Sequence, residues 1–365
     1  MARSFVRPRW LLLAAFAGLA ALLAGCADVR YLAQAAGGQL DLVRRARPVA
    51  AVLADPQTPA ETRRKLELVG RVRAFAVRAQ SQGGLGEGGL GLPDHGSYQT
   101  YVELGRSAVV WNVFRAPELG IELYTSCFPV AGCVGYRGYF AEADARAYAA
   151  SRRAAGEDVT VGGVSAYSTL GYLRDPVLSS MLSAPDASLI RTVIHELAHP
   201  SLYVAGDTIF NESYAVTIEE EGMRRWLAAY GTPELREQDR LAQERAAGFE
   251  NLLLQTRAEL ERLYAQPLPP EQIRAGKQAA LDGLQAQYAT LKASWGGYSG
   301  YDGWFARGVN NASLGAVAAY ASLVPDFQRL LARVGGDIPA FIAGAKACAA
   351  KPQGERQGCL RGEES

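Results

Sequence analysis

The stretch His195-Glu196-Leu197-Ala198-His199 holds two of the three histidines in this 365-residue chain. The residues before it are apolar at helical spacing, and Pro185-Asp186 provides a start signal, so we predict a helix here. Because side chains four residues apart project from the same helix face, both histidines can bind one Zn²⁺. Glu196 would then lie beside the metal-bound water and can act as its general base. The pattern alone also occurs by chance, but its apolar flank and the acidic helix that follows favour the metal site of a zinc hydrolase.

A third ligand is expected on the next helix. Gly206-Asp207 marks the turn, and Asn211 is predicted to cap the helix, which places Glu212 in its first turn, facing the histidines. Glu219 lies two turns further along nearly the same face and is the alternative third ligand. We prefer Glu212, because an acidic residue in a first turn is placed to reach back to the preceding helix. Glu219 would then accept a hydrogen bond from the outer nitrogen of a ligand histidine.

This helix pair resembles the gluzincin pattern, in which HExxH precedes a helix reading Asn-Glu-x-x-Ala. Asn211-Glu212-Ser213-Tyr214-Ala215 matches that helix, and Glu219 matches the second glutamate of the NEGFAxxxE helix of one class of zinc aminopeptidases. Most of the chain is similar to a group of predicted zinc-dependent aminopeptidases that are bacterial lipoproteins. The stretches that carry this similarity are residues 31–48, 136–140, 165–171, the helix pair and residues 310–312.

The resemblance implies an α+β, zincin-like fold with an active-site helix pair, a Zn²⁺ cofactor and a peptide substrate. It implies that His195, His199 and Glu212 bind the metal and that Glu196 is catalytic. It supports a metallopeptidase more strongly than an aminopeptidase. The segment between the two predicted ligand helices is shorter here than in the zinc aminopeptidases that share the pattern, so a shorter connecting loop is expected.

The first 25 residues are predicted to be a lipoprotein signal peptide. Three arginines precede an apolar run too short to span a bilayer comfortably, and Leu23-Ala24-Gly25-Cys26 resembles a bacterial lipobox. Lipidation of Cys26 would anchor the protein to a membrane, and Ala27 favours the outer membrane, facing the periplasm. A plain secretory signal is the alternative.

The other four cysteines and the charge balance fit an exported protein. We predict two local disulfides, Cys127–Cys133 and Cys348–Cys359, because an oxidising compartment permits them. No CxxC pair is present, so a cysteine-rich zinc site is not expected. The formal net charge is +1 with acidic and basic residues mixed throughout, which gives no electrostatic case for nucleic-acid binding.

Beyond the signal peptide, four regions are expected. They are an N-terminal helical region (26–96), a catalytic core with a sheet and the zinc helices (97–231), an antiparallel helical hairpin (232–295) and a C-terminal helical region that completes the core (296–365). Thr58-Pro59-Ala60-Glu61 has the letters of a capping box at the start of one N-terminal helix. The hairpin is predicted from two long amphipathic helices separated by prolines.

Substrate contacts are predicted in two places. Residues 159–167 are predicted to form a strand that Gly162-Gly163 interrupts. If this strand lies at the edge of a sheet, it could bind a peptide substrate through the glycine pair, Ser165 and Tyr167. A bulge without a functional role is the alternative. Tyr298 and Tyr301, in an aromatic and glycine-rich stretch, are candidates for the residue beside the developing oxyanion. The remaining histidine, His95, is expected to be a solvated loop residue.

Together these features predict zinc-dependent peptide hydrolysis, most simply removal of N-terminal residues from peptides in the cell envelope. A zinc endopeptidase is the alternative within the enzyme class. The alternative outside it is a non-catalytic envelope binding or assembly lipoprotein on a peptidase fold. The intact Glu196 argues against a pure binder, which has no need of a base.

Overall fold

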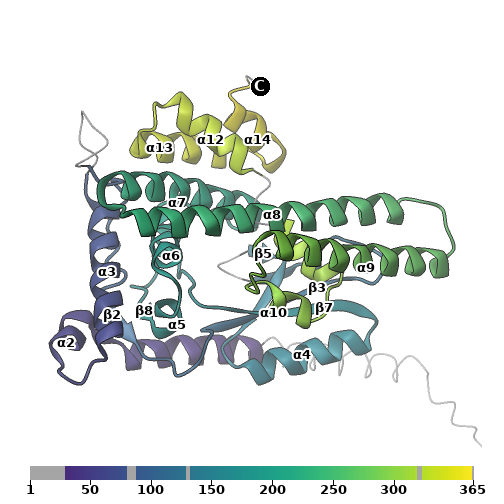
Figure 1. Cartoon of the computed structure of the whole chain (residues 1–365), viewed down its shortest axis with the longest axis horizontal. Helices are drawn as coiled ribbons and strands as arrows, with labels where there is room; N and C mark the ends of the chain where they lie inside the picture. Colours follow the sequence, from purple (N-terminus) through teal and green to yellow (C-terminus); the bar gives the residue numbers. More distant parts are fainter. Residues whose placement is uncertain (1–28, 80–87, 129–131, 319–322, 364–365) are drawn as a thin grey trace, which may run out of the picture. The chain divides into compact units, whose positions relative to one another are not determined.

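The computed structural model describes residues 29–79, 88–128, 132–318 and 323–363 (Figure 1). The predicted signal peptide and Cys26 lie outside these residues. The chain divides into two units, residues 1–45 and 46–365. In the first unit, residues 29–45 form a helix. Among the described residues, no helix combines the length and the apolar character needed to cross a membrane.

The helix that carries the two histidines is buried at the centre of the second unit. This helix, α6 (Asp186–Ala198), packs against α3 (Ala60–Val77), α7 (Thr208–Tyr230) and α8 (Pro233–Tyr264). Its apolar face, including Leu189, Ile190, Val193 and Ile194, is fully buried. Burial of such a side chain stabilises a fold by about 1.5–3 kcal/mol. The predicted helix is therefore confirmed, and its burial fixes where its polar face lies.

A glycine allows α7 to approach α6 closely. A Cβ on Gly222 would lie 2.9 Å from Cγ2 of Ile194, well inside van der Waals contact. Between the two helices, the chain passes through a short 3-10 helix, η1 (His199–Ser201), and a turn at Gly206, whose φ of +80° favours glycine. The regular helix α6 ends at Ala198, two residues before Pro200, although His199 itself keeps helical dihedral angles.

The largest sheet has three antiparallel strands in the order β6-β3-β7. The strands are β3 (Val110–Pro117), β6 (Tyr136–Tyr139) and β7 (Glu157–Val164), and α4 (Glu142–Ala154) joins β6 to β7 and packs on β7. Pairing of β7 with β3 runs without interruption from Val164↔Val110 to Glu157↔Pro117. The interruption predicted at Gly162-Gly163 is therefore wrong, and the alternative of a bulge is excluded as well. The reason is local: a Cβ on Gly163 would lie 2.8 Å from Cβ of Ala108, so this glycine permits close packing within a regular ladder.

Two smaller sheets border the helix pair. One has the order β1-β2-β8, with β1 (Arg47–Pro48), β2 (Thr100–Val102) and β8 (Val177–Leu178), and the other pairs β4 (Ser126–Phe128) with β5 (Gly132–Val134). The short α2 (Val49–Ala54) follows β1. Strand β8 leads through α5 (Ser179–Leu182) into α6. The strand that directly precedes the histidine helix is thus β8, and the edge strand β7 lies one element earlier.

The predicted antiparallel helical hairpin is present as α8 and α9 (Pro270–Ser294). Its apolar contacts include Phe249 and Leu253 on α8 and Leu284 and Tyr288 on α9. The short α10 (Asp302–Ala306) and α11 (Asn311–Ala318) follow, and α11 packs on α8, β3 and β7. In Figure 1, α8 runs above α6 to the right, where α9, β3 and β7 lie.

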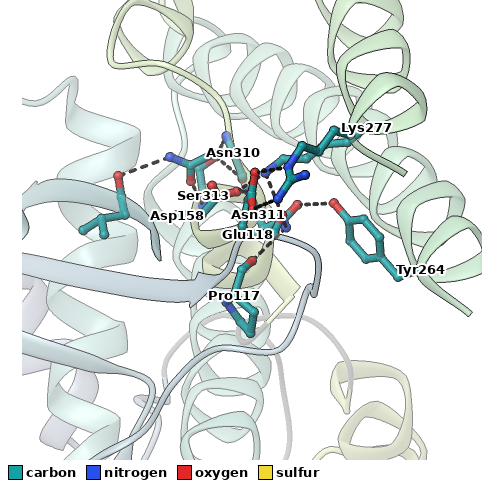
Figure 2. A network of polar contacts seen from close by, with 10 residues as sticks. Pro117, Glu118, Asp158, Tyr264, Lys277, Asn310, Asn311 and Ser313 are labelled. Atoms are coloured by element: carbon teal, nitrogen blue, oxygen red, sulfur yellow. Dashed lines mark hydrogen bonds and ion pairs between the residues drawn. The ribbon is translucent and has the colours of Figure 1, made fainter. Parts of the chain in front are cut away.

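A polar network centred on Asn311 fastens the hairpin to the sheet (Figure 2). Nδ2 of Asn311 donates to the carbonyl oxygens of Pro117 and Glu118 at 3.1 and 2.9 Å, and its Oδ1 accepts from the Tyr264 hydroxyl at 2.8 Å. The network continues from the backbone N–H of Asn311 to Asp158, whose carboxylate also accepts from Lys277 at 2.6 Å. Since Asn311 is fully buried, each of these bonds satisfies a group that has no access to water.

The C-terminal helices cover α7. They are α12 (Val324–Arg333), α13 (Ile338–Ala349) and α14 (Gln353–Arg361). Phe327 packs edge-on against Phe210 with ring centroids 4.9 Å apart, and Phe341 stacks on Tyr214 at 5.6 Å. A disulfide between Cys348 and Cys359 joins α13 to α14, and Cys127–Cys133 joins β4 to β5, as predicted.

Two predicted helix caps are wrong. Thr58 donates to the carbonyl oxygen of Val52 instead of capping α3, so the capping box does not form. Asn211 lies inside α7, whose N-cap is Asp207, accepting from the backbone N–H of Phe210. The predicted place of Glu212 in the first turn is therefore wrong too, since α7 begins at Thr208 and Glu212 lies in its second turn. In both cases a nearby backbone group takes the side chain, a competition that short polar residues allow. The mixed helical and stranded composition nevertheless agrees with the predicted α+β class.

Candidate metal centre

The candidate metal centre lies where the polar face of α6 meets α7. Ligand atoms of His195, His199 and Glu212 all lie within 4.8 Å of one another. Nε2 of His195 is 3.3 Å from Oε2 of Glu212, and Nε2 of His199 is 3.9 Å from the same oxygen. The two imidazole rings are nearly perpendicular, with centroids 4.9 Å apart. Bonds of about 2.0–2.2 Å at tetrahedral angles separate ligands by roughly 3.3–3.6 Å, so these atoms fit one zinc ion with little movement.

The charges around His195 make this site favourable for a cation. Burial alone would lower the pKa of His195, but hydrogen bonds to Glu212 and Glu219 and the charge of Glu196 raise it to about 10. Burial opposes ionisation of Glu212 too, yet the adjacent histidines lower its pKa. Burial, followed by the charge on His195, lowers the pKa of His199 to about 4. The largely buried carboxylates of Glu212 and Glu219 therefore stabilise positive charge beside them, as they would stabilise a metal ion bound to the same residues.

His199 provides a second indication of fit. Its side chain is buried, and among the described residues its Nδ1 has no hydrogen-bond partner. Its Nε2 faces Glu212. An imidazole buried neutral, with one nitrogen directed at the cluster, has the state required of a zinc ligand.

Glu219 supports His195 from the far side of the ring. Its Oε2 lies 3.1 Å from Nδ1 of His195, and its Oε1 accepts from Arg191 at 3.2 Å. Arg191 also makes two bonds to Asp239 on α8, at 2.6 and 3.0 Å. Because Nε2 of His195 faces Glu212 and Nδ1 faces Glu219, Glu212 is the better placed of the two candidate third ligands. The sequence analysis missed Arg191 and Asp239; Arg191 lies four residues before His195, on the same helix face, and that spacing could have revealed it.

Glu196 has the properties of a general base. Burial, together with the negative charges of Glu212 and Asp175, raises its pKa to about 7 against the opposing charge of His195. Within the described part of the chain, no hydrogen bond engages its carboxylate. A carboxyl group with a pKa near the working pH can both accept and release a proton.

Two buried residues near Glu196, Tyr98 and Asp175, were not predicted from the sequence. Tyr98 has a left-handed backbone, with φ of +63°, and its N–H donates to the carbonyl oxygen of Asp175 at 2.7 Å. Burial and the charges of Glu196 and Asp175 raise the pKa of Tyr98. Its buried hydroxyl has no partner among the described residues. Strained backbone of this kind concentrates at functional sites, but no sequence pattern indicates it here.

The connection between the ligand helices is braced from two sides. A Cβ on Gly132, next to Cys133 in the β4-β5 hairpin, would lie 2.5 Å from the backbone nitrogen of Gly206. On the other side Arg356, inside the loop closed by Cys348 and Cys359, forms an ion pair with Asp207. The two disulfide-closed segments therefore support the turn that positions Glu212.

Two of the predicted substrate residues, Ser165 and Tyr167, contact residues outside the ligand cluster. The Ser165 carbonyl accepts from Ser180, and Tyr167 packs edge-on against Phe140 at 6.0 Å. Gly163 packs on Ala108, whereas a Cβ on Gly162 would meet no atom within 4 Å, which leaves its side of the edge strand open.

Tyr298 and Tyr301 pack on the helical hairpin. Tyr301 stacks on Phe249 with centroids 4.0 Å apart, and Arg245 lies 4.1 Å over the Tyr298 ring. Helix α10, which follows them directly, lies away from α6 in Figure 1. Both tyrosines are thus held by hairpin packing, and none of their contacts in the described chain reaches the ligand residues.

Comparison with known proteins identifies the family. Searches of the curated proteins and of the solved structures return no match. A family described as "Putative aminopeptidase" matches residues 30–360, which include every residue of the candidate metal centre. The chain belongs to this aminopeptidase-like family.

Proposed function

We propose that this protein is a zinc-dependent aminopeptidase. The observation that carries the proposal is the convergence of His195, His199 and Glu212 within 4.8 Å, with Glu196 on the same helix. Membership of an aminopeptidase-like family supports peptide hydrolysis by this site.

Each residue has a defined part in the proposed reaction. His195, His199 and Glu212 would hold Zn²⁺, and the bound metal would supply Lewis-acid chemistry, polarising the scissile carbonyl and lowering the pKa of a water. Glu196 takes the proton from the attacking water and delivers it to the leaving amine, a transfer for which a pKa of about 7 is suited. Glu219 orients His195 by accepting from its Nδ1 and is held in turn by Arg191.

The test is mass spectrometry of a peptide pool incubated with zinc-loaded protein, each peptide being present with a free and with an acetylated N-terminus. We expect stepwise loss of N-terminal residues from the free peptides alone. Glu196→Gln should abolish cleavage and retain zinc, whereas Glu220→Gln, a change of the same kind on the surface of α7, should have no effect. Internal cuts in both peptide forms would make the protein an endopeptidase. Cleavage by Glu196→Gln at the wild-type rate would refute the assignment, and no cleavage by folded, zinc-loaded protein would favour the binding or assembly alternative.

We further propose that the enzyme acts in the bacterial cell envelope, attached to the outer membrane by lipid on Cys26. The lipobox-like sequence supports the attachment, and two disulfides agree with an oxidising compartment. Mass spectrometry of the mature N-terminal peptide is the test. A diacylglycerol-modified Cys26 is expected, and an unmodified N-terminus at another residue would contradict the anchor.

A further inference from the structure

A rigid loop borders the candidate metal centre. Residues 168–175, here called the rim loop, are tied together by the buried carboxylate of Asp175. It accepts from the backbone N–H and hydroxyl of Thr169 at 3.0 and 2.7 Å and from the Ser168 hydroxyl at 3.4 Å. Leu170 and Gly171 both have left-handed backbone, with φ of +58° and +82°. The rim loop is thus held in one shape by bonds within itself.

The rim loop touches the ligand segment. A Cβ on Gly171 would lie 3.1 Å from Cβ of Pro200, the residue directly after His199. The same position is 3.6 Å from Nδ1 of His95, which is exposed, as expected, but lies beside the site. Glycine is therefore required at 171 both by its dihedral angle and by this contact.

The rim loop presents apolar side chains to solvent. Tyr172 is 74% exposed and Leu173 is 43% exposed, a large apolar area to leave without a partner. Tyr203, on the segment between the ligand helices, is half-buried. Burial raises the pKa of Tyr203, and the nearby charges of Glu212 and Tyr172 add to the effect. Tyr203 lies three residues after Pro200, against which Gly171 packs, so the segments that carry Tyr203 and Tyr172 meet beside His199.

We propose that Tyr172, Leu173 and Tyr203 form the subsite for the side chain of the substrate's first residue, and that the enzyme prefers an aromatic or large aliphatic residue there. This inference rests on the proposed function. A substrate whose scissile bond lies at the metal places its first side chain beside the ligands. The rim loop reaches this place because Gly171, next to Tyr172, packs on Pro200, next to His199. Aromatic rings and a leucine favour apolar partners, and packing of two rings contributes about 0.5–1.5 kcal/mol beyond the area that it buries.

The test compares aminoacyl-coumarin amides of phenylalanine, leucine and alanine. Wild type should favour phenylalanine and leucine over alanine in kcat/KM. Tyr172→Ala should lower kcat/KM for the phenylalanine substrate about threefold to tenfold, mainly through KM, and change that for alanine less than twofold. Tyr172→Phe should behave as wild type, as should Leu254→Ala, which removes a comparably exposed apolar side chain from α8. An equal loss for phenylalanine and alanine substrates, or no loss, would overturn the subsite.

A binding measurement separates this inference from the proposed function. Calorimetry with Phe-Ala-Ala and Ala-Ala-Ala on the Glu196→Gln protein should show at least threefold tighter binding of the phenylalanine peptide. Addition of Tyr172→Ala should remove that difference. Selective binding without any cleavage by wild type would support the subsite and contradict the proposed function. Glu196-dependent cleavage without preference for the first residue would support the function and overturn the subsite.

Discussion

Glu219 offers a quantitative test of the site, because its two oxygens make different contacts. Oε2 faces Nδ1 of His195 and Oε1 accepts from Arg191. In Glu219→Gln, the single carbonyl oxygen can serve only one of these donors. Arg191 keeps two bonds to Asp239, so the amide can turn its oxygen to His195 and leave the arginine contact unmade. In Glu219→Ala, both contacts disappear.

Loss of a carboxylate that orients a ligand histidine lowers metal affinity about 10- to 100-fold, which corresponds to about 1.4–2.7 kcal/mol. We expect Glu219→Gln near the lower limit and Glu219→Ala near the upper limit. The assay is competition for zinc between the metal-free protein and a chelating dye of known affinity. Glu220→Gln is the matched control, since the neighbouring Glu220 accepts only from Gln328 in an exposed contact.

Two results would refute this reasoning. Zinc affinity of both Glu219 variants within twofold of wild type would show that Glu219 does not support His195. Loss of zinc from Glu219→Gln, with zinc retained by Glu212→Gln, would make Glu219 the third ligand.

Three further predictions concern Asp186 at the start of α6, the Asn311 network and the Cys127–Cys133 disulfide. Hydrogen bonding to Arg64, then to Lys65, lowers the pKa of Asp186 to about 2. The ionised carboxylate therefore stabilises the fold fully at pH values above 3.8, its unfolded pKa, and this stabilisation is lost as the pH falls through about 2. Chemical denaturation should therefore show Asp186→Asn less stable by about 1 kcal/mol at pH 7, a value reduced for partial exposure, with the difference vanishing below about pH 2. Asn311→Ala should lower the free energy of unfolding by about 2–4 kcal/mol, because the Pro117 carbonyl and the Tyr264 hydroxyl lose their bonds to Asn311, while the Glu118 carbonyl keeps only its bond to Lys277. Asn251→Ala, on the exposed face of α8, should change the free energy of unfolding little, and equal values for the two variants would contradict the network of Figure 2. Replacing Cys127 and Cys133 by alanine should lower the free energy of unfolding by about 2–3 kcal/mol. The same change should weaken zinc binding, because the β4-β5 hairpin packs on the turn at Gly206. Unchanged zinc affinity would show that the β4-β5 hairpin does not support the site.

The elements that sequence predicts best are those with a strong local signal. The α6 helix and the hairpin have long amphipathic patterns, and both disulfides close short loops within the sequence. The capping predictions at Thr58 and Asn211 failed because the backbone groups that bind these side chains are brought near by the preceding turn or helix. Sequence spacing alone does not determine which of two nearby backbone groups a short polar side chain will bond to.

His195 and His199 were accessible to sequence reasoning as candidate ligands because their spacing on a helix fixes a common face, whereas Glu212, on α7, was reached through an expected first-turn position, which proved wrong, and through the family resemblance. Asp239 and Tyr98 were not, because each reaches the site from a distant part of the chain through tertiary packing. Tyr298 and Tyr301 show the opposite error. Aromatic residues in a glycine-rich stretch fit a pocket wall or a packing cluster equally well, and here they pack on α8 of the hairpin.

The most direct test of the central claim is anomalous X-ray scattering at the zinc edge from crystals grown with Zn²⁺. We predict one strong anomalous peak, about 2.0–2.2 Å from Nε2 of His195, Nε2 of His199 and a carboxylate oxygen of Glu212. A crystal that binds zinc only elsewhere, or leaves these three residues without a peak, would contradict the account.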